Sequence, residues 1–518
     1  MLSSKIVSAE EAILKIKDNS TVAIGSSGGG FLEPALLLKN LGERYKKTAE
    51  PKNLTLLHST GIGDNKDGGL CHLALKGLIK RDIGGHWGMA PKMVELALNN
   101  DIEAYNLPQG VLSQLFREIA ANRPGLITKV GLRTFIDPRI EGGKLNSVTT
   151  EDIVNLIELN GEEFLFYPAI KIDVALIRGT TADLDGNITL EKEGTFLENL
   201  SIAQAAHNSG GIVIAQVERI AQRGALNPQN VKIPGILVDY IVVDKKQQQT
   251  CITHYNPGYS GEIKVPIESL KPMPLNHRKI IARRATEELK KNCVINLGVG
   301  IADGVALVAA EEGIENQFTF VVEQGLIGGV PAPGVEFGAS LNPIAIIDAP
   351  YQFDFFDGGG VDVAFLGAAE IDRHGNVNVS KFGSHIAGCG GFINISQNAK
   401  KVVFCCTFTT GGLKTKIEDG KLNIIQEGKI KKFVKDVEQI TFSGEYARQI
   451  NNQEVLYITE RAVFRLNSTG LKLIEIAPGI DIEKDVLSLI DFEIEIADKI
   501  HKMDSKIFNA NLMNLKIS

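Results

Sequence analysis

Ile172-Asp173-Val174-Ala175-Leu176 and Val361-Asp362-Val363-Ala364-Phe365 are two copies of one segment, 189 positions apart. Each copy continues into a turn of the form Asp-x-x-Gly-Asn, which ends at Asn187 in the first copy and at Asn376 in the second. Gly and Asn tolerate positive φ angles and therefore suit such a turn. The same offset holds without a gap up to Ile212-Val213-Ile214 and Lys401-Val402-Val403. The repeat predicts the same strand, loop, turn and strand in two halves of the chain.

A second correspondence lies upstream of each copy. Residues 17–25 parallel residues 290–298, and residues 54–61 parallel residues 318–325, with offsets that change as loops of different length require. Matches that keep the same order indicate two related domains. In this correspondence Ser59 of the first half stands where the second half has Glu323. If both halves form one site, its carboxylate is supplied once, so we expect a site at their interface.

Strands alternate with amphipathic stretches in both halves. Residues 91–99 and 302–312 each read as a helix that follows a strand and a glycine turn. This alternation is typical of a mainly parallel sheet covered on both faces. The prediction is two related open α/β/α domains fused in one chain, residues 1–260 and 276–518. A proline-rich linker, residues 261–275, joins them; the prolines around it are Pro257, Pro266, Pro272 and Pro274.

Composition excludes several classes of protein. Hydrophobic residues make up 44% of the chain and charged residues 23%, as in ordinary soluble globular proteins. The formal net charge of −7 provides no general attraction for nucleic acid or anionic lipid. No stretch approaches the ~18 consecutive apolar residues that indicate a membrane span. The first residues lack the apolar core of a secretory signal, so we expect a cytoplasmic protein.

Cysteine and histidine patterns give no sign of a metal site. Six cysteines in 518 residues do not form a disulfide framework, and Cys405 and Cys406 lie in an apolar stretch typical of a core strand. The sequence has no Cys-x-x-Cys pair and no His-Glu-x-x-His motif. It also lacks the Gly-x-x-x-x-Gly-Lys-Ser/Thr phosphate loop, and no Gly-x-Ser-x-Gly elbow of a serine hydrolase stands out. We therefore predict no metal ion and no hydrolase triad.

Glu323 is the leading candidate for a reactive group. It follows the apolar stretch 318–322, which predicts a buried strand, and precedes a glycine-rich turn at Gly325, Gly328 and Gly329. Ligands of open α/β sheets bind outside the carboxyl ends of the strands. A glutamate there can serve as base, metal ligand, ribose acceptor or nucleophile, although most glutamates are only solvated surface charges.

Three glycine loops could present backbone N–H groups to an oxyanion or a phosphate, or could simply turn the chain. They span residues 25–30, 298–300 and 388–391. The second loop raises the alternative of a dinucleotide-binding fold, which needs Gly-x-Gly-x-x-Gly after a strand. Asp303 stands where the third glycine should be, and Gly304 follows it. An aspartate at that packing point would crowd the helix against the strand, so this alternative is disfavoured.

Several long motifs resemble those of the glutamate-dependent, family I coenzyme A (CoA) transferases, most closely the short-chain group that includes propionate CoA-transferase. The resemblance spans nearly the whole chain, including its two fused halves. The motifs that carry it are Glu323-Gln324-Gly325 with Gly328-Gly329-Val330-Pro331, Phe337-Gly338-Ala339-Ser340, Tyr351-Gln352-Phe353-Asp354, Asp357-Gly358-Gly359-Gly360, Gly388-Cys389-Gly390-Gly391-Phe392-Ile393-Asn394 and Phe135-Ile136-Asp137-Pro138-Arg139. The loop before Pro34 differs from the family's spacing, so no role is carried over to residues 28–30.

The resemblance implies a role for particular residues. Glu323 is the expected nucleophile, and Gln109, in Asn106-Leu107-Pro108-Gln109-Gly110, is expected to help hold the developing oxyanion. Gly388, Gly390 and Gly391 match a backbone region near the thioester, and we add Gly298 and Gly300 of the second loop as predicted CoA-binding positions. The family uses no metal and no redox cofactor, because CoA is a substrate. Acyl-CoA and short-chain carboxylates are the expected partners, and a homo-oligomer is expected.

The activity that follows is transfer of CoA from a short-chain acyl-CoA, of the propionyl, acetyl or acetoacetyl type, to a carboxylic acid. A ping-pong mechanism would pass through an acyl-glutamyl anhydride and a glutamyl-CoA thioester. A glutamate of ordinary pKa, about 4.3, is ionised at neutral pH and needs no general base. Two alternatives remain: an acyl-CoA hydrolase on the same scaffold, and a metabolite-sensing protein without catalysis. The sequence leaves the preferred acid open among propionate, acetate, lactate, butyrate and acetoacetate.

For other polar residues a structural role is expected. His86, in a Gly-Gly-His-Trp-Gly turn, is interpreted as packing against its loop, and Asp357, before three glycines, as a turn residue. Lys381, Arg133 and Arg139 could meet the phosphates of CoA, but a solvated or structural role is expected for each one alone.

Overall fold

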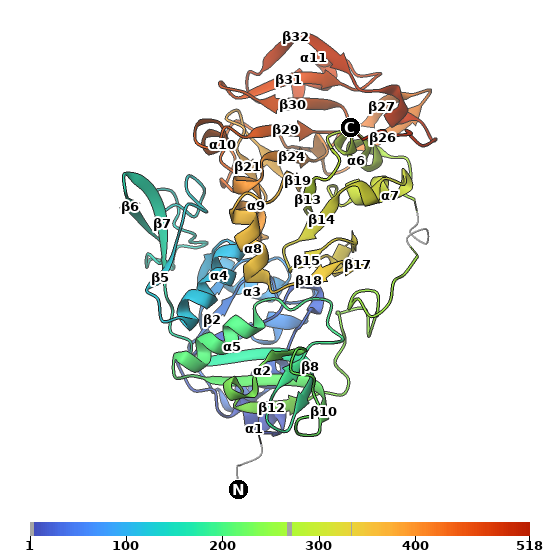
Figure 1. Cartoon of the computed structure of the whole chain (residues 1–518). Helices are drawn as coiled ribbons and strands as arrows, with labels where there is room; N and C mark the ends of the chain where they lie inside the picture. The colour runs from blue at the N-terminus through green and yellow to red at the C-terminus, as the bar shows by residue number, and fades with distance from the viewer. Residues whose placement is uncertain (1–4, 267–271, 333, 518) are drawn as a thin grey trace.

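The computed structural model describes residues 5–266, 272–332 and 334–517. Two large sheets dominate the described residues, one of nine strands and one of ten, and they lie in the lower and upper parts of Figure 1. The first sheet is built from residues before 244 and the second from residues after 293. Residues 267–271 of the predicted linker lie outside the described ranges. So do the first four residues, on which part of the localisation prediction rested.

The first sheet is mainly parallel. Its strands follow the order β11-β9-β8-β1-β2-β3-β4, and β10 and β12 extend it from β8. The pairs β8–β9 and β9–β11 are antiparallel. The strands are β1 (Thr21–Ile24), β2 (Leu54–His58), β3 (Ile79–Gly84), β4 (Glu103–Asn106), β8 (Val174–Asp183), β9 (Ile188–Thr189), β10 (Ile212–Ala221), β11 (Val231–Ile233) and β12 (Tyr240–Val243).

The second sheet has a parallel centre with antiparallel pairs on both sides, and its last pair, β31–β32, is parallel again. Its order is β18-β15-β14-β13-β19-β24-β29-β30-β31-β32. Strands β14, β13, β19, β24 and β29 pair in parallel. The strands are β13 (Val294–Leu297), β14 (Thr319–Val322), β15 (Leu326–Ile327), β18 (Ala345–Ile346), β19 (Val363–Gly367), β24 (Lys401–Cys405), β29 (Glu454–Ile458), β30 (Ala462–Leu466), β31 (Leu471–Ile476) and β32 (Glu495–Lys502).

The two sheets repeat one another in register. In the first sheet Thr21 pairs with Thr55, Val22 with Val174, and Val174 with Ile212. In the second sheet the equivalent pairs are Val294 with Thr319, Ile295 with Val363, and Val363 with Lys401. These pairs are equivalent, residue by residue, under the correspondence found between the two halves of the sequence. The repeat found in the sequence is therefore a repeat of four paired strands.

Both faces of each sheet are buried at its central strands. Along β1, Ala23 belongs to one apolar cluster while Val22 and Ile24 belong to another on the opposite face. Along β19, Phe365 and Ala364 divide in the same way between two further clusters. Because successive side chains of a strand point to opposite faces, this division requires cover on both sides. The predicted α/β class with mainly parallel, doubly covered sheets is confirmed.

The helices that cover the sheets come mostly from the connections between parallel strands. The two helices expected from the sequence are present, but α7 begins two residues later than predicted. The helices are α1 (Ala9–Ile13), α2 (Ala35–Thr48), α3 (Pro91–Leu98), α4 (Gln109–Ala120), α5 (Asn199–Asn208), α6 (His277–Thr286), α7 (Gly304–Glu311), α8 (Ala349–Asp357), α9 (Phe392–Asn398), α10 (Gly444–Gln449) and α11 (Ile482–Asp485).

Smaller sheets decorate both halves. A three-stranded antiparallel sheet of β5, β7 and β6 projects from the side of the first half (Figure 1). The remaining short strands pair two by two. These strands are β5 (Gly125–Thr128), β6 (Asn155–Leu159), β7 (Glu162–Pro168), β16 (Val330–Pro331), β17 (Ser340–Leu341), β20 (Glu370–Ile371), β21 (Val377–Asn378), β22 (Lys381–Phe382), β23 (His385–Ile386), β25 (Thr409–Thr410), β26 (Lys414–Glu418), β27 (Lys421–Gln426) and β28 (Ile430–Lys431).

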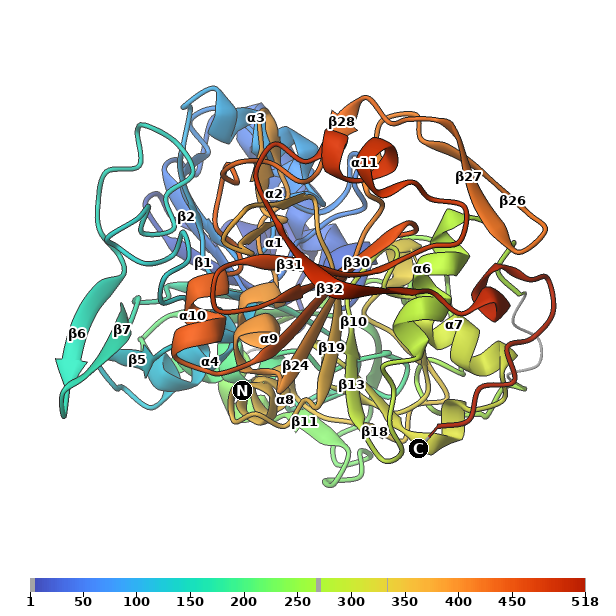
Figure 2. The ribbon, with the colours of Figure 1, turned by 90° about the horizontal axis from the view of Figure 1, so that it is seen from above.

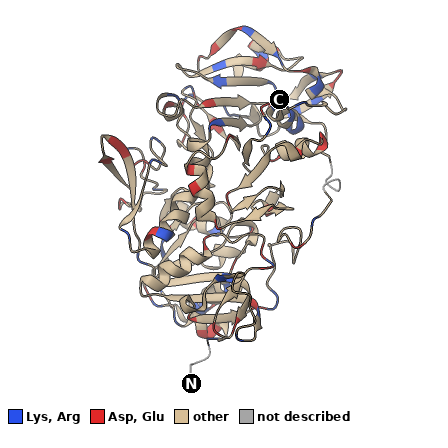
Figure 3. Cartoon of the chain, in the orientation of Figure 1, with Lys and Arg blue, Asp and Glu red and all other residues tan. Residues whose placement is uncertain are grey.

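The halves meet through helices. Helix α4 of the first half packs against α8 and α9 of the second, and the three lie together in both views (Figures 1 and 2). Arg117 of α4 forms a bidentate ion pair with Asp354 of α8, with one N–O distance of 2.7 Å. Lys and Arg are interspersed with Asp and Glu in both halves (Figure 3), so electrostatics must be argued from individual neighbours. No helix of the described part of the chain has the length and apolar character to cross a membrane.

Candidate active site

Glu323 lies where the sequence predicts, directly after β14 (Thr319–Val322). Its side chain faces a cavity of about 470 Å³ whose walls come from both halves of the chain. Only 7% of the residue is exposed. Ser59, the equivalent residue of the first half, does not line this cavity, because its hydroxyl donates a hydrogen bond to the buried Glu198 carboxylate. The carboxylate is thus supplied to this cavity by one half, as the repeat suggested.

Gln109 is brought to the same cavity from the first half, as the first residue of α4. Its backbone N–H donates to the carbonyl oxygen of Gly390 at 2.8 Å. Its side-chain nitrogen, Nε2, is buried and has no partner among the described residues. An N–H donor that is held by its backbone and unpaired at its tip is suited to meet an oxyanion on a bound substrate.

The loop of residues 388–391 connects these two side chains. Gly390 and Gly391 are consecutive, and a Cβ at position 390 would lie 3.7 Å from Oε1 of Gln109. A Cβ at position 391 would lie 2.8 Å from Cγ of Glu323. Real Cβ contacts are longer than this, so glycine at 391 is needed for Glu323 to keep its place. The loop itself is fixed to the first half, because Gly390 donates to Gly85 at 2.7 Å and Cys389 to Asn106 at 2.8 Å.

Several residues with unpaired polar atoms line this cavity. Buried polar atoms without a hydrogen-bond partner occur at His86 (Nδ1), Gln109 (Nε2), Glu323 (Oε2) and Gln324 (Oε1), and all four residues line it. Leaving a buried polar group unpaired typically costs ~1–3 kcal/mol, so folded proteins rarely collect such groups without a reason. A polar ligand that enters the cavity would supply the missing partners.

The environment of Glu323 differs from the sequence expectation in one respect. Burial raises the pKa of Glu323 to about 7, and hydrogen bonds from its own backbone and from Asn296 only partly offset that effect. No charged group contributes to this shift, so the carboxylate has no permanent ion-pair partner among the residues that the structure describes. The expectation of an ordinary pKa near 4.3 was therefore wrong, because the sequence does not reveal how little water reaches this side chain.

Not all of the other predicted glycines line the cavity. Gly298 and Gly388 line the cavity together with Gly390 and Gly391. Gly300 does not line it; its carbonyl oxygen accepts a hydrogen bond of 2.9 Å from Arg278. The predicted contact of Gly300 with CoA stays a prediction. From the first loop, to which no role was carried over, Ser27 and Gly28 also reach the cavity.

The structural roles expected for His86 and Asp357 need revision. His86 was expected only to pack, but it lines the cavity, and burial together with His58 and His385 lowers its pKa to about 4. The imidazole is therefore neutral at physiological pH. Asp357 is the last residue of α8, and its carboxylate accepts hydrogen bonds from Asn394 and Gln114 at 3.0 Å. It is a buried acceptor as well as a residue before a turn.

The candidate phosphate-binding cations do not line the cavity. Arg139 forms ion pairs with Asp137 and Glu163, both at 2.7 Å, and Arg133 lies 3.7 Å from Glu163. Sequence reasoning also missed Asn394, whose side chain contacts the start of α4. It stands inside a quoted motif, but only the fold reveals its partner.

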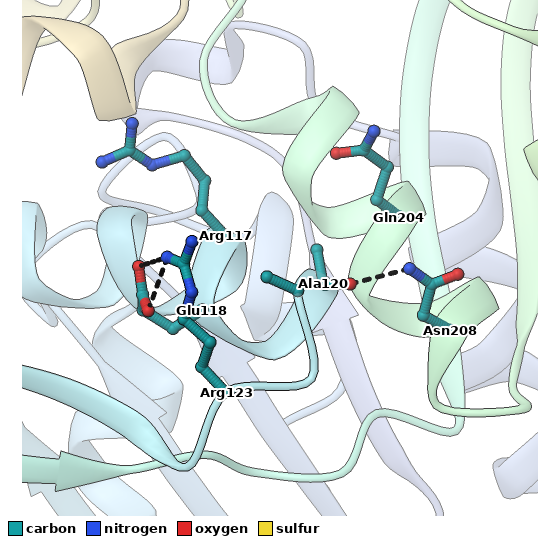
Figure 4. Close-up of a pocket in the computed structure, with 7 residues that line it drawn as sticks. Arg117, Glu118, Ala120, Arg123, Gln204 and Asn208 are labelled. Carbon is teal, nitrogen blue, oxygen red and sulfur yellow. Dashed lines mark hydrogen bonds and ion pairs between the residues drawn. The ribbon is translucent and has the colours of Figure 1, made fainter.

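A second cavity, of about 490 Å³, lies between α4 and α5 (Figure 4). Its arginines are already engaged, Arg123 with Glu118 at 2.9 Å and Arg117 with Asp354. None of the sequence-predicted site residues lines it. The described residues also contain no group of three or more His, Cys, Asp or Glu side chains arranged to hold a metal ion. The Glu323 cavity is therefore the one where the predicted residues meet.

Fold and site together define a class of enzyme: two repeated α/β halves enclose one buried carboxylate beside an unpaired amide donor. The profile of the coenzyme A transferase family matches residues 6–244. The chain is 49% identical over 504 residues to the acetate CoA-transferase YdiF of Escherichia coli K12, covering 97% of this chain and 95% of that protein. It is 48% identical over 515 residues to the caffeate CoA-transferase of Acetobacterium woodii, covering 98% of each.

Among solved structures, the chain is similar to the acyl-CoA transferase YdiF of Escherichia coli O157:H7 in a thioester complex with CoA. The TM-score is 0.95 at 47% identity, with 99% of this chain and 98% of that chain covered. The chain belongs to the coenzyme A transferase family and is a CoA-transferase.

Proposed function

We propose that this enzyme moves CoA from a short-chain acyl-CoA to a free carboxylic acid, with Glu323 as the covalent nucleophile. The observation that carries the proposal is the Glu323 carboxylate, which faces the interface cavity. Within the described ranges, Oε2 accepts no hydrogen bond and no cation contributes to the pKa of the carboxyl. A nucleophile held in an ion pair could not attack, and a fully sealed one could not be reached. The relatives named for acetate and for caffeate both use carboxylic acids, which supports the class of acceptor.

The first half-reaction exchanges one acyl bond for another. A carboxylate oxygen of Glu323 attacks the thioester carbonyl, the C–S bond breaks, and CoA leaves as a thiolate. The product is an anhydride between the acyl group and Glu323. The thiolate then attacks the side-chain carbonyl carbon of Glu323, the anhydride C–O bond breaks, and the first carboxylate departs. Glu323 is left as a thioester with CoA.

The second half-reaction runs these steps in reverse with the acceptor acid. The acceptor carboxylate attacks the glutamyl thioester, CoA leaves as a thiolate, and a new anhydride forms. The thiolate attacks the acyl carbonyl of that anhydride, which releases the new acyl-CoA and restores the Glu323 carboxylate. One thioester replaces another, so no redox step and no external energy source is needed. We propose on this chemical ground that neither a metal nor a redox cofactor takes part.

Each step passes through a tetrahedral oxyanion. The unpaired Nε2 of Gln109 and the backbone N–H of Gly391, which lies against Glu323, are the candidate donors. The N–H groups of Gly388, Cys389 and Gly390 already donate to Ser380, Asn106 and Gly85. Loss of one such donor typically costs ~3 kcal/mol of transition-state stabilisation. The raised pKa of Glu323 also fits the role, since a carboxylate with little hydration is a better nucleophile than one in water.

Trapping tests the proposal directly. The enzyme is incubated with propionyl-CoA without an acceptor acid, treated with hydroxylamine or borohydride, and digested for mass spectrometry. Modification at Glu323, and loss of transfer in Glu323→Ala, are the expected results. Glu315→Ala, just upstream of β14, is a matched control that should keep activity. Transfer by Glu323→Ala at near wild-type rate would refute the mechanism, and continuous thiol release without an acceptor would indicate a hydrolase.

A further inference from the structure

Helix α4, which carries Gln109 as its first residue, has no capping side chain of its own. The residue before it is Pro108, which makes no side-chain hydrogen bond to the helix. The first N–H groups of a helix lack partners within the helix and must be satisfied from elsewhere. Here Gln109 donates to the carbonyl oxygen of Gly390 at 2.8 Å, and Gly110 donates to Oδ1 of Asn394 at 3.0 Å. Both acceptors come from the other half of the chain.

Asp357 determines which way the Asn394 amide points. Nδ2 of Asn394 donates to both carboxylate oxygens of Asp357, at 3.0 and 3.2 Å. Burial raises the pKa of Asp357 to about 7, and the three amide donors around it favour the ionised form. An ionised carboxylate only accepts hydrogen bonds, so it selects the NH₂ end of the Asn394 amide and leaves Oδ1 for Gly110. Asn398 and Gln114 donate to the same carboxylate at 3.3 and 3.0 Å. Because Gln114 belongs to α4, Asp357 is tied both to the cap of the helix and to its second turn.

Gly110 and Asn394 are tightly packed where the two halves meet. A Cβ at position 110 would lie 2.4 Å from Nδ2 of Asn394 and 2.4 Å from a ring carbon of Phe353. Asn394 is completely buried. The backbone of Gly110 is therefore in close contact with the second half, and Gln109 is its immediate neighbour. Any movement of the Asn394 side chain is transmitted to the residue whose amide faces the cavity.

We propose that Asn394, oriented by Asp357, is a positioning residue that sets the place of the Gln109 side-chain amide relative to Glu323. The inference rests on the proposed function of Gln109 as an oxyanion donor. Small displacements of a donor reduce transition-state stabilisation much more than substrate binding. Asn394 therefore acts on turnover through Gln109 and has no contact with substrate in this account.

A double-mutant cycle tests the connection. The variants are Gln109→Ala, Asn394→Ala and the combination of both, each assayed for kcat and KM with propionyl-CoA and acetate. We expect Gln109→Ala to lower kcat by about 10²–10³-fold. We expect Asn394→Ala to lower kcat by about tenfold or more with KM little changed, and the double variant to be no worse than Gln109→Ala within about threefold.

Multiplied losses in the double variant would overturn the proposal, because they would mean that Asn394 does not act through Gln109. A wild-type kcat in Gln109→Ala would also overturn it. Trapping at Glu323 in the single variants separates this failure from failure of the proposed function: covalent labelling at Glu323 would still support the nucleophile. Absence of labelling in the wild-type enzyme would instead refute the reaction itself.

An exchange of the two side chains supplies a second test that does not depend on deletion. Asn394→Asp places two carboxylates together and should abolish most activity. Adding Asp357→Asn restores a donor opposite a carboxylate, with an acceptor oxygen again facing Gly110. Because the new NH₂ group replaces one of the two oxygens to which Asn398 and Gln114 donate, we expect a partial, several-fold recovery of kcat over Asn394→Asp. No recovery in a folded double variant, checked by circular dichroism, would overturn the orienting role of Asp357. Gln204→Ala, in α5 and away from this contact, is the control.

Discussion

Removal of the Glu323 charge should make the enzyme inactive and, at alkaline pH, more stable. Burial raises the pKa of this carboxyl from 4.5 to about 7. In the folded state it therefore holds a proton, between about pH 4.5 and 7, that the unfolded chain has already lost. Stability consequently falls as the pH rises through this window, and the full cost is present above it. Glu323→Gln keeps the size of the side chain and removes the charge.

The magnitude follows from the shift. A rise from 4.5 to about 7 corresponds to about 3 kcal/mol at ~1.4 kcal/mol for each pH unit. Spread over the unfolding entropy of a 518-residue chain, ~2.1 cal/mol/K per residue, this predicts an increase in Tm of about 3 °C. The gain should appear at about pH 8.5 and vanish below about pH 4.5, where the Glu323 carboxyl is protonated in both the folded and the unfolded state.

The assay is thermal unfolding of the wild-type and Glu323→Gln proteins across this pH range. Glu493→Gln, which removes one charge from an exposed position, serves as the control for the change in net charge. The reasoning would be refuted by a Tm gain that is the same at acid and alkaline pH, or by a loss of stability at about pH 8.5. Either result would mean that Glu323 is not a desolvated charge.

Three further predictions concern the rate, the wall of the cavity and the core. The value of kcat/KM should increase with pH and level off with an apparent pKa near 7, because only ionised Glu323 attacks; an acid limb near pH 4.5 in a pH–rate profile would contradict this. Glu336 stands between the cavity residues Val335 and Phe337, and it accepts hydrogen bonds from Thr250 and Tyr259 at 2.8 and 2.9 Å. Glu336→Ala should therefore raise the KM for acyl-CoA several-fold, and Tyr259→Phe should raise it less. Equal KM values for the variants and the wild-type enzyme in steady-state assays would argue against this prediction. Arg178 and Glu193 form a buried pair at 3.1 Å. Glu193→Ala should cost about 3–5 kcal/mol in urea unfolding, because the buried guanidinium loses its carboxylate partner and keeps only its hydrogen bonds to the carbonyl oxygens of Glu33 and Gln248. Lys92→Ala, which breaks the exposed pair with Asp67, should cost less than about 1 kcal/mol, and similar costs for the two variants would refute the argument.

The sequence determined the architecture and the place of Glu323, the proposed nucleophile. The repeat at an offset of 189, together with the upstream match, predicted strands that pair in the same register in both halves. It also placed Glu323 at the end of a buried strand and Ser59 at the equivalent position. These features depend on local patterns: apolar runs that form strands, glycine turns that end them, and the order of elements along the chain.

Only the tertiary structure decided what surrounds Glu323. The pKa of Glu323 depends on how much water the second half and the first half together exclude, which no local pattern records. The cap of α4 joins Gly110 to Asn394, 284 positions away, and the 388–391 loop is tied to Gly85 across the same interface. Contacts of this kind depend on how two separately patterned sheets dock. Hydrogen bonds between side chains far apart in sequence therefore became visible only in the folded molecule.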